Sequence, residues 1–183
     1  MRISTRSIVV AGLLLAVAIV LAVTRLGYFP VPNVTDDATI MHVPAIIGGV
    51  LEGPVVGLLV SLVFGINAYF RYVGLPFFAG QPAWVPVLVL FVPRLFIGIV
   101  AWLVYRALHK TNQVVALAAA GVAGTLTNTI LVLGFAIGLG VLPAAIIPTA
   151  LPQAIFEMVV AAIITVAVVA AWKQIDTGRG SSV

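Results

Sequence analysis

The segment TIMHVPAIIGGVLEGPVVGLLVSLVFGINAYF, residues 39–70, is largely apolar over a length that exceeds one membrane crossing. A helix needs about 20 apolar residues to span the hydrocarbon core of a bilayer. The run is interrupted at Glu52-Gly53-Pro54, and a proline disfavours the helical conformation in the residue before it. This pattern predicts two short antiparallel helices, at about 40–52 and 55–70, in place of one long helix.

The rest of the chain is as apolar as this segment. Of its 183 residues, 63% are hydrophobic and 8% charged, and the mean hydropathy is +1.27. A soluble domain needs a more polar surface, so we expect an all-α integral membrane protein with one domain, residues 1–183. Four further helices are predicted at about 8–24, 84–107, 114–140 and 151–172, which makes six in total.

The basic residues predict how the helices are oriented. With a cytoplasmic N-terminus, the cytoplasmic side carries Arg2, Arg6, Arg106, Lys110, Lys173 and Arg179. The opposite side then carries Arg25 and Arg71. Because cytoplasmic loops are enriched in Lys and Arg, we expect both termini in the cytoplasm and a multi-pass location in the plasma membrane.

The sequence lacks the residue patterns that several kinds of protein chemistry require. There is no G-x-x-x-x-G-K-[ST] loop for ATP and no cysteine, and we expect no cofactor in this chain. His42 and His109 are predicted on opposite membrane sides and cannot share a metal ion. The basic residues are scattered, which argues against nucleic-acid binding. An enzyme is disfavoured.

Polar residues inside the predicted helices are the candidate site. An arginine deep in a bilayer costs at least about 2.5 to 3.5 kcal/mol, so a residue such as Arg94 is a functional-site hypothesis by default. Counted from the helix ends, the polar residues fall in the outer half of the membrane, which predicts a polar cavity opening outward. The candidate binding residues are Arg94, Asn128, Glu157, Asn67, His42, Tyr69, Trp84 and Gln153.

Each candidate also has a purely structural interpretation, which the sequence leaves open. Arg94 and Glu157 are an alternative ion pair between two helices, and Asn128 is alternatively a helix–helix hydrogen-bonding residue. His42 is alternatively interfacial, and Trp84 part of an aromatic belt. Small residues four apart, Ala18 and Ala22, could serve packing within the chain or contact with a partner protein.

Four stretches carry a family resemblance: residues 39–66, VPRLFIGIVAWLVYRAL (92–108), AGTLTNTILVLG (123–134) and PQAIFEMVVAAIITVAVV (152–169). In order and spacing they resemble the substrate-binding (S) components of energy-coupling factor (ECF) vitamin transporters. The resemblance implies a six-helix fold, an extracellular vitamin site, and three partners: a transmembrane coupling protein and two cytoplasmic ATPases that use ATP. It also implies that small residues of the first helix contact the coupling protein, namely Ala11, Ala18 and Ala22.

The resemblance is strongest to members assigned to pantothenate. Arg94 would then hold the ligand carboxylate by a bidentate pair, with Asn128, Asn67 and Glu157 near its hydroxyl or amide groups. An ionised Glu157 would instead suit a neutral or cationic ligand, such as a pyridoxine-like compound, hydroxymethylpyrimidine or thiamine. Riboflavin would need more stacking aromatics than Tyr69, Tyr72, Phe77 and Trp84 obviously supply, and folate is a further alternative. A stand-alone secondary carrier and a small membrane enzyme are the other functions considered.

Overall fold

The computed structural model describes residues 5–30 and 37–174. Five helical segments are long and apolar enough to cross a membrane: Thr5–Thr24, Pro54–Tyr72, Trp84–Leu108, Gln113–Gly138 and Ala144–Lys173. Val43–Glu52 is a shorter apolar helix. Five long segments and one short one agree with the six predicted helices and with an all-α membrane protein.

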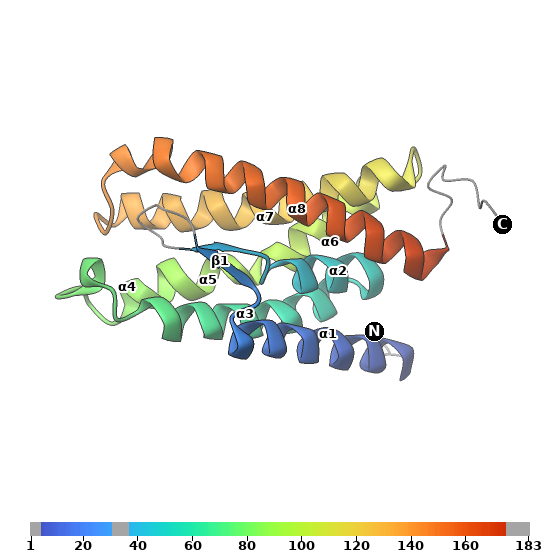
Figure 1. Ribbon diagram of the computed structural model, residues 1–183, viewed down its shortest axis with the longest axis horizontal. Coiled ribbons are helices and arrows are strands. Elements are labelled where there is room, and N and C mark those ends of the chain that lie inside the picture. Colours follow the sequence, from blue (N-terminus) through green and yellow to red (C-terminus); the bar gives the residue numbers. More distant parts are fainter. Residues whose placement is uncertain (1–4, 31–36, 175–183) are drawn as a thin grey trace.

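The elements follow one another along the chain as a bundle with a small hairpin after its first helix (Figure 1). Their bounds are α1 Thr5–Thr24, β1 Tyr28–Pro30, β2 Asp37–Thr39, α2 Val43–Glu52, α3 Pro54–Tyr72, η1 Pro76–Phe78, α4 Trp84–Pro86, the π-helical η2 Val87–Phe91, α5 Val92–Leu95, α6 Ile97–Leu108, α7 Gln113–Gly138, η3 Ala144–Ile146 and α8 Ile147–Lys173. The antiparallel hairpin pairs Tyr28 with Thr39 and Pro30 with Asp37.

The predicted break between the second and third helices is present. Gly53 separates α2 from α3 with a φ of 95°, a left-handed value that glycine adopts readily. Pro54 then begins α3 at a position where no intrahelical amide hydrogen is required. The two helices pack against each other directly after this turn.

Two predicted helices differ from their expected form. The segment from Trp84 to Leu108 is not continuous, because it contains the π-helical turn η2 and a break at Phe96. The last helix, α8, begins at Ile147 and not near residue 151, since a proline is tolerated in the first turn of a helix. Pro152 lies inside α8.

Glycines permit the closest helix contact in the bundle, where α2, α3 and α6 meet. The carbonyl of Gly98 on α6 lies against Gly49 on α2, and Gly98 also lies against the backbone of Gly57 on α3. A Cβ atom added to Gly98 would lie 2.6 Å from the Cα atom of Gly57. The crossing is therefore a backbone-to-backbone contact of the kind small residues allow in membrane proteins.

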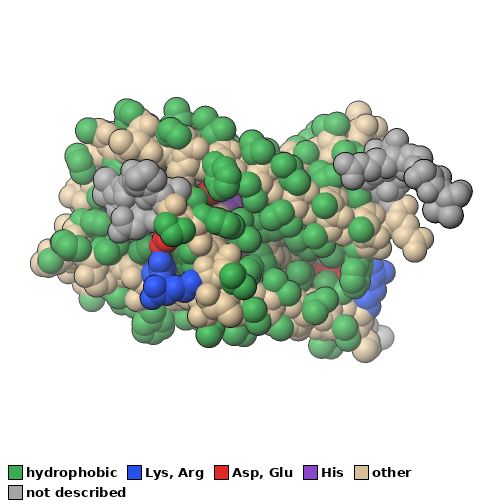
Figure 2. All heavy atoms as spheres, in the orientation of Figure 1, with side chains coloured by type: hydrophobic (Ala, Val, Ile, Leu, Met, Phe, Trp, Pro, Cys, Tyr) green, Lys and Arg blue, Asp and Glu red, His purple; other side chains and the backbone are tan. Residues whose placement is uncertain are grey.

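The outside of the bundle is mostly hydrophobic, as a lipid-facing surface requires. Figure 2 shows hydrophobic side chains spread along this whole face, with the Lys and Arg side chains confined to small separate groups. The first residues of α1 and the last residues of α8 lie toward the same end of the long axis (Figure 1). The two described ends of the chain therefore lie on the same side, as the expected topology requires.

Candidate functional site

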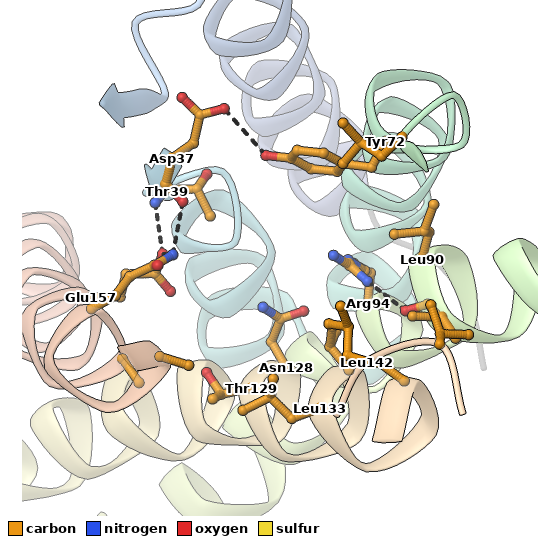
Figure 3. Close-up of a pocket in the computed structure, with 18 of the residues that line it drawn as sticks. Asp37, Thr39, Tyr72, Leu90, Arg94, Asn128, Thr129, Leu133, Leu142 and Glu157 are labelled. Carbon is orange, nitrogen blue, oxygen red and sulfur yellow. Dashed lines mark hydrogen bonds between the residues drawn. The ribbon is translucent and has the colours of Figure 1, made fainter. Parts of the chain in front are cut away.

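A cavity lies at the end of the bundle that carries the hairpin and η1. It contains about 930 Å³ of space not filled by protein atoms, including the part open to the outside. Its walls come from the hairpin, α3, η1, η2, α5, α7 and α8, and most of the side chains are apolar. Several polar side chains interrupt this lining, and Figure 3 labels most of them. Besides the hydroxyl groups of two tyrosines, Tyr28 and Tyr72, they are Asp37, Thr39, Arg94, Asn128, Thr129, Gln153 and Glu157.

Arg94 is placed in this cavity by an irregular stretch of helix. Pro93 follows the π-helical turn η2, and π-helical turns often occur at functional sites. The Arg94 side chain is 6% exposed, and its Nη1 donates a hydrogen bond of 2.8 Å to the carbonyl oxygen of Val89. Its guanidinium lies 5.6 Å from the ring of Phe64, close enough for a cation–π contact.

The positive charge of Arg94 has no counter-charge among the described residues. Within the described part of the chain, no carboxylate oxygen lies within 4.0 Å of its nitrogens, and its Nε has no hydrogen-bond partner. The alternative in which Arg94 and Glu157 form a direct ion pair is therefore not found. A buried, unpaired guanidinium is costly, which makes it the most unusual group in the cavity.

Glu157 instead holds the hairpin against α8. Its Oε1 accepts hydrogen bonds from the Thr39 amide at 2.7 Å and from Gln153 Nε2 at 3.1 Å. Gln153 Nε2 also donates to the Asp37 carbonyl at 2.7 Å. These bonds explain how a carboxylate that is 4% exposed is tolerated without an arginine partner, because it accepts from two donors.

Glu157→Ala is expected to lower the free energy of unfolding by about 1 to 3 kcal/mol, because it leaves the amide of Thr39 without an acceptor. Glu157→Gln keeps an oxygen at this position and should cost less. Thermal unfolding of the detergent-solubilised variants measures the difference. Equal midpoints for wild type and Glu157→Ala would show that this contact does not hold the hairpin.

Asn128 contributes the second unsatisfied polar atom of the cavity. It is 8% exposed on α7, and its Oδ1 has no hydrogen-bond partner among the residues that the structure describes. Figure 3 shows Asn128 and Arg94 both directed toward the open space between α7 and the hairpin. A bound molecule could therefore meet an acceptor and a cationic donor on neighbouring walls.

An ion pair that the sequence analysis missed closes the rim of the cavity. Arg71 at the end of α3 forms an ion pair with Asp37 of β2, and its Cζ lies 4.3 Å from the centre of the Tyr28 ring. The Tyr72 hydroxyl is 3.4 Å from the same carboxylate. The basic residue in the last turn of α3 and the acid near the end of the loop were visible in the sequence. Their pairing could not be predicted, because it depends on the hairpin that holds Asp37 near the end of α3.

Asn67 lies at this rim and not in the cavity lining. The Tyr28 hydroxyl donates a hydrogen bond to Asn67 Oδ1. Burial raises the pKa of Tyr28, so its phenol keeps the proton that this bond needs. Asn67 therefore fixes Tyr28, which does line the cavity.

Three more predicted binding residues, besides Asn67, lie outside the cavity lining. His42 is fully buried, and its Nε2 is 2.9 Å from the Thr125 hydroxyl, so it is a core residue and not an interfacial one. Tyr69 packs edge to face with Phe70, at 5.6 Å between ring centres. Trp84 is 56% exposed, consistent with an aromatic belt. These predictions used only the position of each residue along its helix. Whether a side chain lines the cavity also depends on its direction around the helix axis, which the sequence alone did not give.

The cavity has more aromatic side chains than the sequence analysis assigned to it. Five of its lining residues are aromatic: Tyr28, Phe64, Tyr72, Phe77 and Phe78. Tyr72 and Phe77 were considered from the sequence, whereas Tyr28, Phe64 and Phe78 were missed. The Pro76-Phe77-Phe78 turn was the available signal, because a short turn between helices can direct both rings toward the bundle.

The small residues of α1 face in a different direction from the one expected for a partner contact. Ala11 is 8% exposed and Ala18 is fully buried, because both belong to the stripe that packs on α2 and α3. Ala22 is half-buried at the edge of this stripe. The exposed face of α1 carries Gly12 and Ala16, and a Cβ added to Gly12 would meet no atom within 4 Å.

This arrangement is that of a multi-pass membrane protein that binds a small solute. Apolar helices surround a cavity whose lining is largely apolar and contains a few directed polar groups, as small-molecule sites generally do. Residues 6–169 match the family model of the ECF transporter substrate-specific component. The chain belongs to this family, whose members are transporter subunits and not enzymes. No curated protein matches the chain significantly.

Proposed function

We propose that this protein captures a carboxylate-bearing, water-soluble vitamin from outside the cell, with pantothenate as the first candidate. Both termini lie in the cytoplasm of a cell whose plasma membrane holds the protein. A transmembrane coupling protein and two cytoplasmic ATPases supply the energy for import, so ATP is used by the partners. The site residues that we assign to the ligand are Arg94 and Asn128, with Glu157 and Gln153 beside them.

The observation that carries the proposal is the unpaired charge of Arg94. A guanidinium that is 6% exposed and has no carboxylate of residues 5–30 or 37–174 within 4.0 Å favours an anion from the ligand. A carboxylate matches the fork of a guanidinium and accepts two parallel hydrogen bonds. Since Glu157 is engaged by Thr39 and Gln153, it does not take this position.

Pantothenate also suits the remaining walls. Its hydroxyl and amide N–H groups can donate to the free Oδ1 of Asn128. Its dimethyl-substituted carbon suits the apolar lining, which includes Leu90, Leu133 and Leu142. A flat aromatic vitamin such as riboflavin is the second candidate, because five aromatic side chains line the cavity.

Mass spectrometry of small molecules released from the purified, denatured protein tests the proposal. Release of pantothenate from wild type, and its absence from an equally folded Arg94→Ala variant, supports both the ligand and the role of Arg94. If a flavin is released, the second candidate holds. A protein that carries no vitamin, and gains no thermal stability from any in a panel, contradicts the proposed capture function.

The exposed face of α1 provides a test of the partner assignment. Gly12→Leu fills a position that lies on the outside of the described chain, so ligand affinity should change less than about twofold. If this face meets the coupling protein through small residues, uptake by cells should fall by about tenfold or more, because bulk prevents close helix approach. Gly134→Leu on α7, which is also exposed with no atom near its added Cβ, is the matched control.

Co-purification of the ATPases should be lost with Gly12→Leu and kept with Gly134→Leu. Normal uptake by Gly12→Leu would place the partner on another face of the protein. Normal uptake by wild-type cells that lack any ATPase partner would favour a stand-alone carrier.

A further inference from the structure

Pro93 determines which acceptor is available to the side chain of Arg94. Val89 lies in the π-helical turn η2, where the Val92 amide donates to the carbonyl of Val87, five residues earlier. Once the chain returns to the regular α-helical register, the carbonyl of residue 89 accepts a hydrogen bond from the amide of residue 93. Pro93 has no amide hydrogen, so the Val89 carbonyl lacks this partner. Nη1 of Arg94 occupies the position instead and donates to the Val89 oxygen at 2.8 Å.

This replacement holds the guanidinium in place without neutralising its charge. The carbonyl is an uncharged acceptor, so Arg94 remains a full cation for a ligand. A flexible arginine in a membrane helix would otherwise extend toward the nearest water. One hydrogen bond to the backbone and the nearby ring of Phe64 keep it beside Asn128. Such preorganisation strengthens binding by reducing the ordering cost on association.

We propose that Pro93 is a positioning residue that prepares Arg94 for an anionic ligand by removing the backbone donor that competes for the Val89 carbonyl. The expected effect of Pro93 on ligand binding rests on the ligand role proposed for Arg94. The exchange of hydrogen-bond donors at the Val89 carbonyl does not depend on that role. Pro93→Ala restores an amide hydrogen at residue 93. The Val89 carbonyl can then accept it in a regular helical turn, and this amide competes with the guanidinium for the same oxygen.

The exchange can be measured without any ligand. Full-length protein is labelled with carbonyl-¹³C valine and guanidinium-¹⁵N arginine and reconstituted in lipid for dipolar-recoupling solid-state NMR. Among the described residues, Arg94 to Val89 is the one guanidinium-to-valine-carbonyl hydrogen bond. The dipolar contact that disappears in Arg94→Lys identifies this pair, and we expect it to disappear in Pro93→Ala as well.

Binding gives the functional measurement. The probes are pantothenate and pantothenol, in which a CH₂OH group replaces the carboxylate. We expect Pro93→Ala to weaken pantothenate binding about tenfold and pantothenol binding less than about twofold, so the preference for the carboxylate falls. The thermal midpoint should stay unchanged or rise, because a proline inside a helix costs stability. A purely structural proline would show a lower midpoint and equal losses for both probes.

Pro86→Ala is the matched control. Pro86 is a buried proline of the same span, and the carbonyl four residues before it already accepts the Val85 amide at 2.9 Å. The Pro86→Ala variant should leave both the NMR contact and the preference for the carboxylate probe unchanged. A contact that persists in Pro93→Ala overturns the proposal, and so does a lost contact with unchanged carboxylate preference.

Two further results separate this proposal from the proposed function. If wild type binds neither probe, pantothenate is not the ligand, and the NMR contact alone decides whether Pro93 positions Arg94. If Pro93→Ala does not fold, Pro93→Gly restores the same amide. Failure of both variants to fold assigns Pro93 to folding and overturns the positioning role.

Discussion

Arg94→Ala is expected to weaken pantothenate binding roughly 30-fold or more while leaving a folded protein. Removing one partner of a buried hydrogen-bonded charge pair typically costs about 2 to 5 kcal/mol of binding free energy, and each 1.4 kcal/mol is about tenfold. The fold should survive, because no carboxylate of the described chain depends on Arg94. Isothermal titration and thermal unfolding of the same detergent preparations measure both quantities.

Two control variants separate charge from geometry. Arg94→Lys keeps the positive charge but loses the planar fork, so we expect its affinity to lie between those of wild type and Arg94→Ala. Arg106→Ala removes a guanidinium that lies over the ring of Trp102 on α6, outside the cavity lining, and should bind normally. Unchanged affinity in Arg94→Ala would show that the ligand lies elsewhere.

The stability of Arg94→Ala also tests the interpretation that the sequence left open. An Arg94–Glu157 ion pair predicts marked destabilisation, since Glu157 would be left buried without compensation. It also predicts recovery when Glu157→Gln is added. The contacts of Glu157 with Thr39 and Gln153 predict neither effect. A destabilised Arg94→Ala rescued by the second change would contradict the geometry described above.

The helices could be predicted from the sequence because their signals are local. The Glu52-Gly53-Pro54 break needs a glycine and a proline in fixed order, and both act through their own backbone. The depth of Arg94 and Asn128 follows from the rise per residue of a helix. These two residues do line the cavity, on separate helices.

The direction in which a side chain points could not be predicted in the same way. His42 does lie at the start of α2, near a helix end as predicted, yet its side chain contacts Thr125 because α2 packs on α7. Ala18 has the spacing of an interface residue but packs within the chain on the inner face of α1. The rim pair of Asp37 and Arg71 depends on a hairpin whose strands are three residues long. Strands this short carry little periodic signal.

Pro93 is an intermediate case. Its position next to Arg94 was visible, and a proline inside a helix predicts a local irregularity. The form of that irregularity, a π-helical turn whose carbonyl holds the arginine, depends on the helices packed around it. Sequence features thus indicated some of the residues that line the cavity, whereas their hydrogen bonds depend on the assembled bundle.

Gly98→Ala is expected to lower the free energy of unfolding by about 3 kcal/mol or more, the upper part of the range for overpacked cores. The added Cβ would lie 2.6 Å from both the Cα and the carbonyl carbon of Gly57. These are backbone atoms, so no side chain can rotate to make room, and α3 and α6 must separate. Ligand affinity per folded molecule should fall as well, because α6 continues the span that carries Arg94.

Gly134→Ala is the matched control for this substitution. It adds the same methyl group to α7 at a position with no atom within 4 Å, and alanine has the higher helix propensity. Its thermal midpoint should therefore equal or exceed that of wild type. The measurement is the temperature at which each detergent-solubilised variant loses its monodisperse peak in size-exclusion chromatography. Equal midpoints for Gly98→Ala and Gly134→Ala would mean that the helices can separate at little cost, and the three-glycine crossing would not be what fixes α6 against α3.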